Sequence, residues 1–167
     1  MKRLLATLFL MTVGCAAEPD LIGDSPATHI RVTPRTLSDV IEEARSSYQL
    51  PRGLIEGVIM VESKFDETAV NFEPDLCKRK KWSEDKCASY GLMQVIYGWH
   101  KKDCGLKSHV DLYDPETNIQ CGAKVLSGYL RQERGDVAAA LKRFNGIKGS
   151  GYEVKVLSAA LHFTRNG

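Results

Sequence analysis

Apolar residues recur at helical spacing over most of the chain after residue 36. The stripe from Leu37 to Tyr48 predicts an amphipathic helix with Thr36 as its N-cap. A second helix is expected to start at Pro51 and to run to Glu62, and because it is apolar nearly all round it should be the buried central helix. Four more helices are expected: from near Gly91 towards His100, from Asp114-Pro115 to Leu130, from Val137 to Phe144 with Gly146 as its stop, and from Tyr152 to Phe163. No segment alternates with period two for long, so the fold should be all or mainly α.

The first fourteen residues have the pattern of an export signal. A short positive start is followed by ten uncharged, mostly apolar residues, Leu4 to Val13. That stretch is too short to span a bilayer, which needs about 20 residues, and fits the hydrophobic region of a signal peptide. Thr12-Val13-Gly14-Cys15 resembles a bacterial lipoprotein processing box, which implies removal of residues 1–14 and lipidation of Cys15. The alternative is an ordinary secretory signal, cut near Ala16 or Ala17.

Residues 15–35 contain three prolines and scattered polar residues, so we expect a flexible tether between the lipid anchor and a domain over residues 36–167. Ala16, directly after the cysteine, resembles the outer-membrane sorting pattern. The expected location is therefore the periplasmic face of the bacterial outer membrane, with the lipid anchor as the contact to the membrane.

Composition and charge exclude several classes of protein. Hydrophobic residues make up 43% and charged residues 26% of the 167 residues, as in an ordinary globular protein, which excludes collagen-like, coiled-coil and multi-span membrane chains. Two of the 23 basic residues lie in the predicted signal peptide, so 21 remain against 21 acidic residues. A near-neutral mature chain argues against nucleic-acid binding, which favours a basic excess.

Four cysteines remain after Cys15, and an even number in an exported chain predicts two disulfides. Three connectivities are possible, of which neighbour pairing, Cys77–Cys87 with Cys104–Cys121, is the simplest. The chain has no C-x-x-C motif and its histidines lack the spacing of metal ligands. We therefore expect neither a metal site nor another cofactor.

Glu62 is the candidate catalytic residue, because it ends the most apolar helix of the chain. Burial there raises the pKa of a carboxyl group, and the dipole at the helix C-terminus acts in the same direction. A carboxyl that keeps its proton near neutral pH suits general acid catalysis. The alternative is a last-turn glutamate that reaches solvent.

Three short motifs occur in a fixed order: Glu62-Ser63, then Gly91-Leu92-Met93-Gln94, then Phe144-Asn145-Gly146. They resemble the signature motifs of SLT-type lytic transglycosylases, a lysozyme-like family that cleaves peptidoglycan and is related to goose-type lysozymes. The similarity extends over about residues 40–160 and includes Leu112–Ile119 followed by Gly122-Ala123-Lys124. It implies a mainly α, lysozyme-like helical domain around a buried central helix.

The resemblance also implies a reaction. Glu62 would protonate the glycosidic oxygen between N-acetylmuramic acid and N-acetylglucosamine, and as a base it would then deprotonate the C6 hydroxyl that attacks C1. The product is a 1,6-anhydromuramoyl end, made by a monomer without water. By resemblance, the residues that contact the glycan strand or hold the site are Ser63, Gly91, Met93, Gln94 and Asn145. Plainer roles exist for four of them: helix-end hydrogen bonding for Ser63 and Asn145, core packing for Met93, and an exposed helix position for Gln94.

The sequence departs from the family pattern in two places. About residues 71–88 lie between the first two motifs as an insertion, which Cys77 and Cys87 would close as a disulfide loop. Phe144 replaces the tyrosine of the third motif, which removes a phenol expected to hydrogen-bond near the catalytic carboxyl. Tyr152 is the candidate replacement.

Two other functions are compatible with the motifs. The first is a muramidase that uses water, as in goose-type lysozymes, with Asp66 or Glu67 as the nearest second carboxylate. The second is a catalytically idle wall-binding lipoprotein. Inside the insertion, the basic run Lys78–Lys81 is either a solvated face or a contact to anionic peptide stems or headgroups. Aromatic side chains such as Trp82 and Trp99 suit either stacking on sugar rings or core packing.

Overall fold

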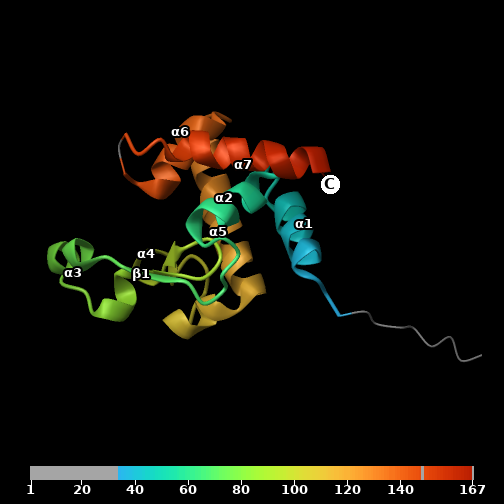
Figure 1. The fold of residues 1–167 in the computed structure, drawn as a ribbon. Coiled ribbons are helices and arrows are strands. Elements are labelled where there is room, and N and C mark those ends of the chain that lie inside the picture. Colours follow the sequence, from blue (N-terminus) through green and yellow to red (C-terminus); the bar gives the residue numbers. More distant parts are fainter. Residues whose placement is uncertain (1–33, 148, 167) are drawn as a thin grey trace, which may run out of the picture. The chain divides into compact units, whose positions relative to one another are not determined.

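The computed structural model describes residues 34–147 and 149–166 of the 167-residue chain. The predicted signal peptide, Cys15 and all but the last two residues of the predicted tether lie outside the described residues. Residues Pro34–Gly167 form one compact unit, and it is mainly helical as predicted (Figure 1). Within the described residues, none of the helices combines the length and the apolar character that a membrane span requires.

The predicted central helix is confirmed as α2 (Leu54–Glu62), which lies between the other helices in Figure 1. It packs closely against α7 (Tyr152–Asn166) because glycine replaces a side chain where the two helices meet. A Cβ added at Gly57 would lie 2.7 Å from the backbone oxygen of Val156, which is closer than carbon and oxygen can approach. Helix α1 (Leu37–Ser47) begins after Thr36 and contacts α2.

The start of α2 differs from the prediction, which placed it at Pro51. The helix begins at Leu54, and its N-cap Gly53 has φ +73°, a left-handed conformation that no right-handed helix can include. A Cβ at Gly53 would also lie 2.4 Å from the backbone oxygen of Ala160 in α7. Gly53 therefore both starts the central helix and lets the end of α7 cross it.

Capping residues set the limits of the two helices that complete the helical layer. Helix α5 (Pro115–Gln132) is capped by Asp114, and α6 (Val137–Asn145) is capped by Asp136 and stops at Gly146, which has φ +72°. These limits agree with the predicted ones to within two residues. Helix α5 packs against α1 and α6, and α6 packs against α7.

A small antiparallel sheet, which the sequence did not predict, lies below α2 in Figure 1. Its strands are β1 (Val70–Phe72), β2 (Ala88–Tyr90) and β3 (Val95–Ile96), in that order, with Val70 opposite Tyr90 and Tyr90 opposite Val95. The expected helix from Gly91 to His100 is wrong for its first six residues. Two positive φ angles, +68° at Gly91 and +48° at Gln94, turn the chain from β2 into β3, and only Tyr97–His100 is helical, as α4.

The insertion between β1 and β2 holds α3 (Pro74–Lys80) and a 3₁₀ turn, η1 (Glu84–Lys86). The disulfide Cys77–Cys87 joins the middle of α3 to the residue before β2, and a second disulfide, Cys104–Cys121, joins the segment after α4 to α5. The structure thus contains two disulfides, in the neighbour pairing. A second 3₁₀ turn, η2 (His109–Tyr113), leads into α5.

Peptide mapping under non-reducing conditions is expected to recover these two pairs. The disulfide Cys104–Cys121 joins residues 17 apart, so its loss in the double variant Cys104→Ser/Cys121→Ser should lower the free energy of unfolding by about 3 kcal/mol. Urea denaturation of wild type and variant, both under oxidising conditions, measures the difference. Crossed pairs in the peptide map, or equal midpoints, would contradict the assignment.

Candidate active site

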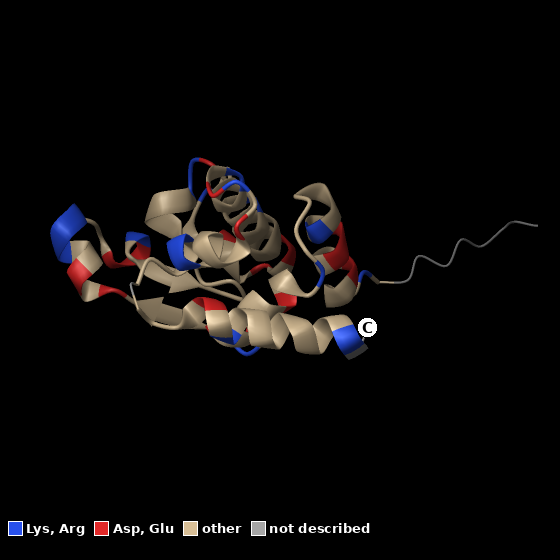
Figure 2. Cartoon of the chain, turned by 90° about the horizontal axis from the view of Figure 1, so that it is seen from above, with Lys and Arg blue, Asp and Glu red and all other residues tan. Residues whose placement is uncertain are grey.

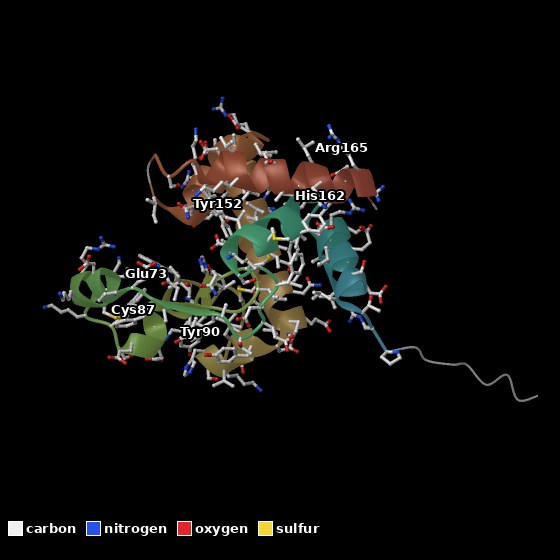
Figure 3. The ribbon with its side chains drawn as sticks, in the orientation of Figure 1. Glu73, Cys87, Tyr90, Tyr152, His162 and Arg165 are labelled. Carbon is white, nitrogen blue, oxygen red and sulfur yellow. A yellow bond between two sulfur atoms is a disulfide. The ribbon has the colours of Figure 1, made fainter. Side chains whose placement is uncertain are left out.

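The carboxyl group of Glu62 lies at the C-terminal end of the buried helix α2 and faces the first residue of α7. The hydroxyl of Tyr152 donates a hydrogen bond to Oε1 of Glu62 at 2.6 Å. Tyr152 is 4% exposed, whereas Glu62 is half-buried. The hydrogen bond therefore connects two residues that lie 90 positions apart in the sequence. Figure 3 shows Tyr152 beside α2.

Burial sets the protonation of this pair. It raises the pKa of Glu62, in the direction expected from the sequence, and the hydrogen bond from Tyr152 acts against it as the smaller effect. Burial and the adjacent carboxylate also raise the pKa of Tyr152 well above its usual range. The phenol consequently stays protonated and acts as a donor, while the raised pKa of Glu62 favours the protonated carboxyl that a general acid requires.

Ser63 takes the plainer of its two predicted roles. Its hydroxyl donates to the backbone oxygen of Ile59 at 3.2 Å, one turn back in α2, and not to Glu62. Such a bond satisfies a carbonyl at the helix end. The Ser63 hydroxyl therefore makes no hydrogen bond to Glu62 in this structure.

Gln94 does not project from a helix, contrary to the prediction. Its amide nitrogen donates to the backbone oxygens of Ala69, at 3.1 Å, and Gly91, at 2.9 Å, and its Oε1 accepts from the hydroxyl of Ser89 at 2.9 Å. Both amide hydrogens are therefore used by the protein. Gln94 ties the turn between β2 and β3 to the loop that follows Glu62.

The packing of Met93 and Gly91 stabilises this turn. Met93 is fully buried, and its side chain packs against Gly122 so closely that a Cβ there would lie 2.5 Å from its sulfur. Met93 thus takes the plainer of its two predicted roles, core packing. A Cβ at Gly91 would lie 2.4 Å from both Nδ2 of Asn118 and the backbone oxygen of Leu112, so glycine is required there for space as well as for its positive φ.

Asn118 holds the same turn and was not singled out from the sequence. This fully buried amide accepts from the backbone N–H of Met93 and donates to the backbone oxygens of Tyr90 and Leu112, each at 2.8 Å. One feature of the sequence could have identified Asn118. It is an amide that lies four residues before Gly122, on the otherwise apolar face of α5. A buried amide that bonds three backbone groups fixes the path of the chain.

Asn145 forms hydrogen bonds in the loop that leads to Tyr152. Its Oδ1 accepts from the backbone N–H of Ile147 at 3.3 Å and from the hydroxyl of Ser150 at 3.1 Å, and Ser150 in turn accepts from the backbone N–H of Tyr152 at 3.3 Å. Phe144, the residue before, is half-buried and packs against the core. Asn145 of the third motif thus helps to position Tyr152, whose hydroxyl bonds Glu62.

The candidate second carboxylates are turned to other partners or to solvent. Asp66 accepts from both the hydroxyl and the backbone N–H of Thr68, at 2.7 and 2.9 Å, and these bonds lower the pKa of its carboxyl group. Both Asp66 and Glu67 are exposed. In residues 34–147 and 149–166, no cluster of three or more His, Cys, Asp or Glu side chains is arranged to hold a metal ion.

Comparison with known proteins gives one match. The family model described as the transglycosylase SLT domain matches residues 39–159, which is well over half of the chain and includes all three motifs. No curated protein and no solved structure matches the chain.

Proposed function

Because the chain belongs to the transglycosylase SLT family, we propose that it is a lytic transglycosylase of peptidoglycan. It cleaves the β-1,4 bond between N-acetylmuramic acid and N-acetylglucosamine and leaves a 1,6-anhydromuramoyl end. The observation that carries this proposal is the pair of Glu62 and Tyr152, in which a buried carboxyl group has a neutral phenol, and not a second carboxylate, as its hydrogen-bond partner.

In the first step, protonated Glu62 donates its proton to the glycosidic oxygen, which leaves as the C4 hydroxyl of N-acetylglucosamine. Positive charge develops at C1 of the muramoyl sugar, and the oxygen of its own 2-acetamido group stabilises that charge. In the second step, ionised Glu62 takes the proton of the C6 hydroxyl while this oxygen bonds to C1. The carboxyl group regains its proton, and no water is consumed.

Tyr152 supports both steps. Its hydroxyl occupies Oε1 of Glu62, which leaves Oε2 to meet the substrate. A hydrogen bond from a phenol stabilises the carboxylate that exists between the two proton transfers. In this proposal Tyr152 supplies the phenol that is absent at Phe144.

The decisive experiment is digestion of purified sacculi followed by mass spectrometry of the released muropeptides. Anhydro ends are lighter than hydrolysed ends by one water, so the masses distinguish the two reactions directly. Products that carry the extra water would identify a muramidase. Absence of any product, from folded protein that still binds sacculi, would identify a wall-binding protein without activity.

The variant Tyr152→Phe is expected to shift the pH dependence of the rate. The hydrogen bond from Tyr152 lowers the pKa of Glu62 against the larger effect of burial, so its removal should raise that pKa further. The decline of kcat/KM at high pH, where the general acid loses its proton, should then move to higher pH. The matched control is Tyr113→Phe, which removes a half-buried phenol that makes no hydrogen bond in the described residues. A Tyr152→Phe profile that does not move would contradict the role of this phenol.

We also propose that Cys15 carries a lipid that holds the protein at the periplasmic face of the outer membrane. Support comes from the sequence alone: a basic start, a ten-residue apolar stretch and small residues before the cysteine. Wild-type protein should fractionate with membranes, and Cys15→Ser should yield a soluble or unprocessed form. A wild-type mature chain that is soluble and starts at Ala16 or later would favour ordinary secretion.

A further inference from the structure

Four consecutive cations gather at the C-terminal end of α3, inside the insertion and outside the Glu62 site. They are Lys78, Arg79, Lys80 and Lys81. All four are exposed, and none forms an ion pair with another residue in the described part of the chain. Figure 2 shows this basic end of α3 at the edge of the molecule. The acidic residues of the insertion include Asp75 in the first turn of α3 and Glu84 and Asp85 in η1, and none of them forms an ion pair with the four cations.

An exposed tryptophan from another element lies against this basic cluster. Trp99 of α4 is 46% exposed, and Nζ of Lys80 lies 4.3 Å from the centroid of its ring. Trp82 meets Trp99 edge to face, with ring centroids 5.1 Å apart. A Cβ at Gly98 would lie 2.5 Å from the ring of Trp82, so this glycine lets α4 approach the insertion. A broad aromatic surface and several cations thus share one patch.

The patch is fixed to the fold rather than carried on a free loop. The disulfide Cys77–Cys87 closes the insertion, and Leu76 is buried beneath α3. The hydroxyl of Tyr90, in β2, donates to the backbone oxygen of Asp85 at 3.1 Å. Because these contacts fix the backbone beside Trp99, little conformational entropy is lost when a ligand binds there.

We propose that Trp99 and the cations Lys78–Lys81 form a second peptidoglycan-binding site, separate from the catalytic pair. Trp99 stacks on a sugar ring, and the cations bind the free carboxylates of the peptide stems. The proposal rests on the proposed function for the identity of the ligand. In Figure 1, α3 lies at one side of the molecule, away from α1.

A glycan strand fits this patch better than an anionic membrane does. Both ligands attract cations, but the indole ring of Trp99 is held against Lys80 and Trp82 and is 46% exposed. A ring fixed in this way suits stacking on a sugar better than insertion among lipid chains. Peptidoglycan offers both chemical groups at short range, because each muramoyl sugar carries a peptide with a free carboxylate. Trp99 would supply the contact to the sugar and Lys80 the contact to the carboxylate.

The test measures binding without catalysis, in the full chain carrying Cys15→Ser and Glu62→Gln. Co-sedimentation with sacculi should show that Trp99→Ala, and separately Arg79→Gln/Lys80→Gln, each bind about three- to tenfold more weakly than this parent. The matched controls are Leu161→Ala, which shortens an apolar side chain that is 57% exposed on α7, and Arg134→Gln/Arg165→Gln, which removes the same charge elsewhere. Trp99→Tyr should restore most of the binding, which separates stacking from a folding defect.

Two further arms identify the ligand. An amidase that removes the peptide stems also removes the cross-links, so it releases soluble glycan strands, and binding to these strands is measured by isothermal titration calorimetry. On them the charge variant should lose its difference from the parent, whereas Trp99→Ala should keep its defect. Vesicles of phosphatidylglycerol and phosphatidylethanolamine should bind the parent and the Trp99→Ala variant equally. Binding to sacculi that is equal in variants and controls, or a loss confined to vesicles, would overturn the second site. Failure of the wild type to release anhydro ends would instead remove the catalytic proposal and leave these binding results intact.

Discussion

Replacing Glu62 with glutamine is expected to lower the rate of sacculus digestion by about 10²–10⁴-fold, because general acid–base catalysis contributes that much and the proposed mechanism assigns both proton transfers to this residue. The amide has nearly the same shape as the carboxyl group, and its oxygen can still accept the hydrogen bond from Tyr152. It can neither donate a proton to the glycosidic oxygen nor take one from the C6 hydroxyl. Release of anhydro ends, followed by mass spectrometry, measures the loss.

The same variant gives a stability test with the opposite sign. Burial raises the pKa of Glu62 above its unfolded value, so the folded protein binds this proton more tightly than the unfolded chain does. The contribution to stability is complete below the unfolded pKa and is lost as pH rises through the folded pKa. Glu62→Gln cannot ionise and should therefore melt at a higher temperature than wild type at alkaline pH, with a smaller difference at acid pH. An active Glu62→Gln variant, digesting at more than a tenth of the wild-type rate, would rule out Glu62 as the acid.

The helices could be predicted because their signals are local. Thr36, Asp114 and Asp136 cap helices whose apolar stripes follow directly, and Gly146 ends one of them. The sheet could not be predicted, because strands of two or three residues are too short to show alternation. The turn at Gly91 depends on contacts with α5, which lies far along the chain, so nothing near Gly91 in the sequence indicates it.

The motifs located the right segments but not the roles of their side chains. Ser63, Met93 and Gln94 all have conformations in which backbone bonding or core packing uses their functional groups. Tyr152 was only a candidate in the sequence, since a separation of 90 residues gives no local sign of a hydrogen bond to Glu62. Most motif residues thus support the loop next to Glu62, and the proposed proton chemistry rests on Glu62 alone.

Asn118→Leu is expected to be the most destabilising single substitution considered for this site. Leucine has a similar volume but offers neither a donor nor an acceptor. The backbone N–H of Met93 and the backbone oxygens of Tyr90 and Leu112 would lose their partner in the interior. Each buried group left without a partner costs about 1–3 kcal/mol, so the free energy of unfolding should fall by at least about 3 kcal/mol.

Activity should fall along with stability. The three lost hydrogen bonds hold the turn from Gly91 to Gln94. Gln94 in turn donates to the backbone oxygen of Ala69, in the loop that follows Glu62. The matched control is Gln120→Leu, which replaces an amide on the same helix that makes no hydrogen bond in the described part of the chain. Urea denaturation should separate the two variants by several kcal/mol, while digestion assays well below both melting temperatures should show a loss for Asn118→Leu alone. Equal unfolding midpoints would mean that Gly91 and the core, and not this amide, hold the turn. The effect of α5 on the position of Glu62 would then depend on the packing of Met93 against Gly122.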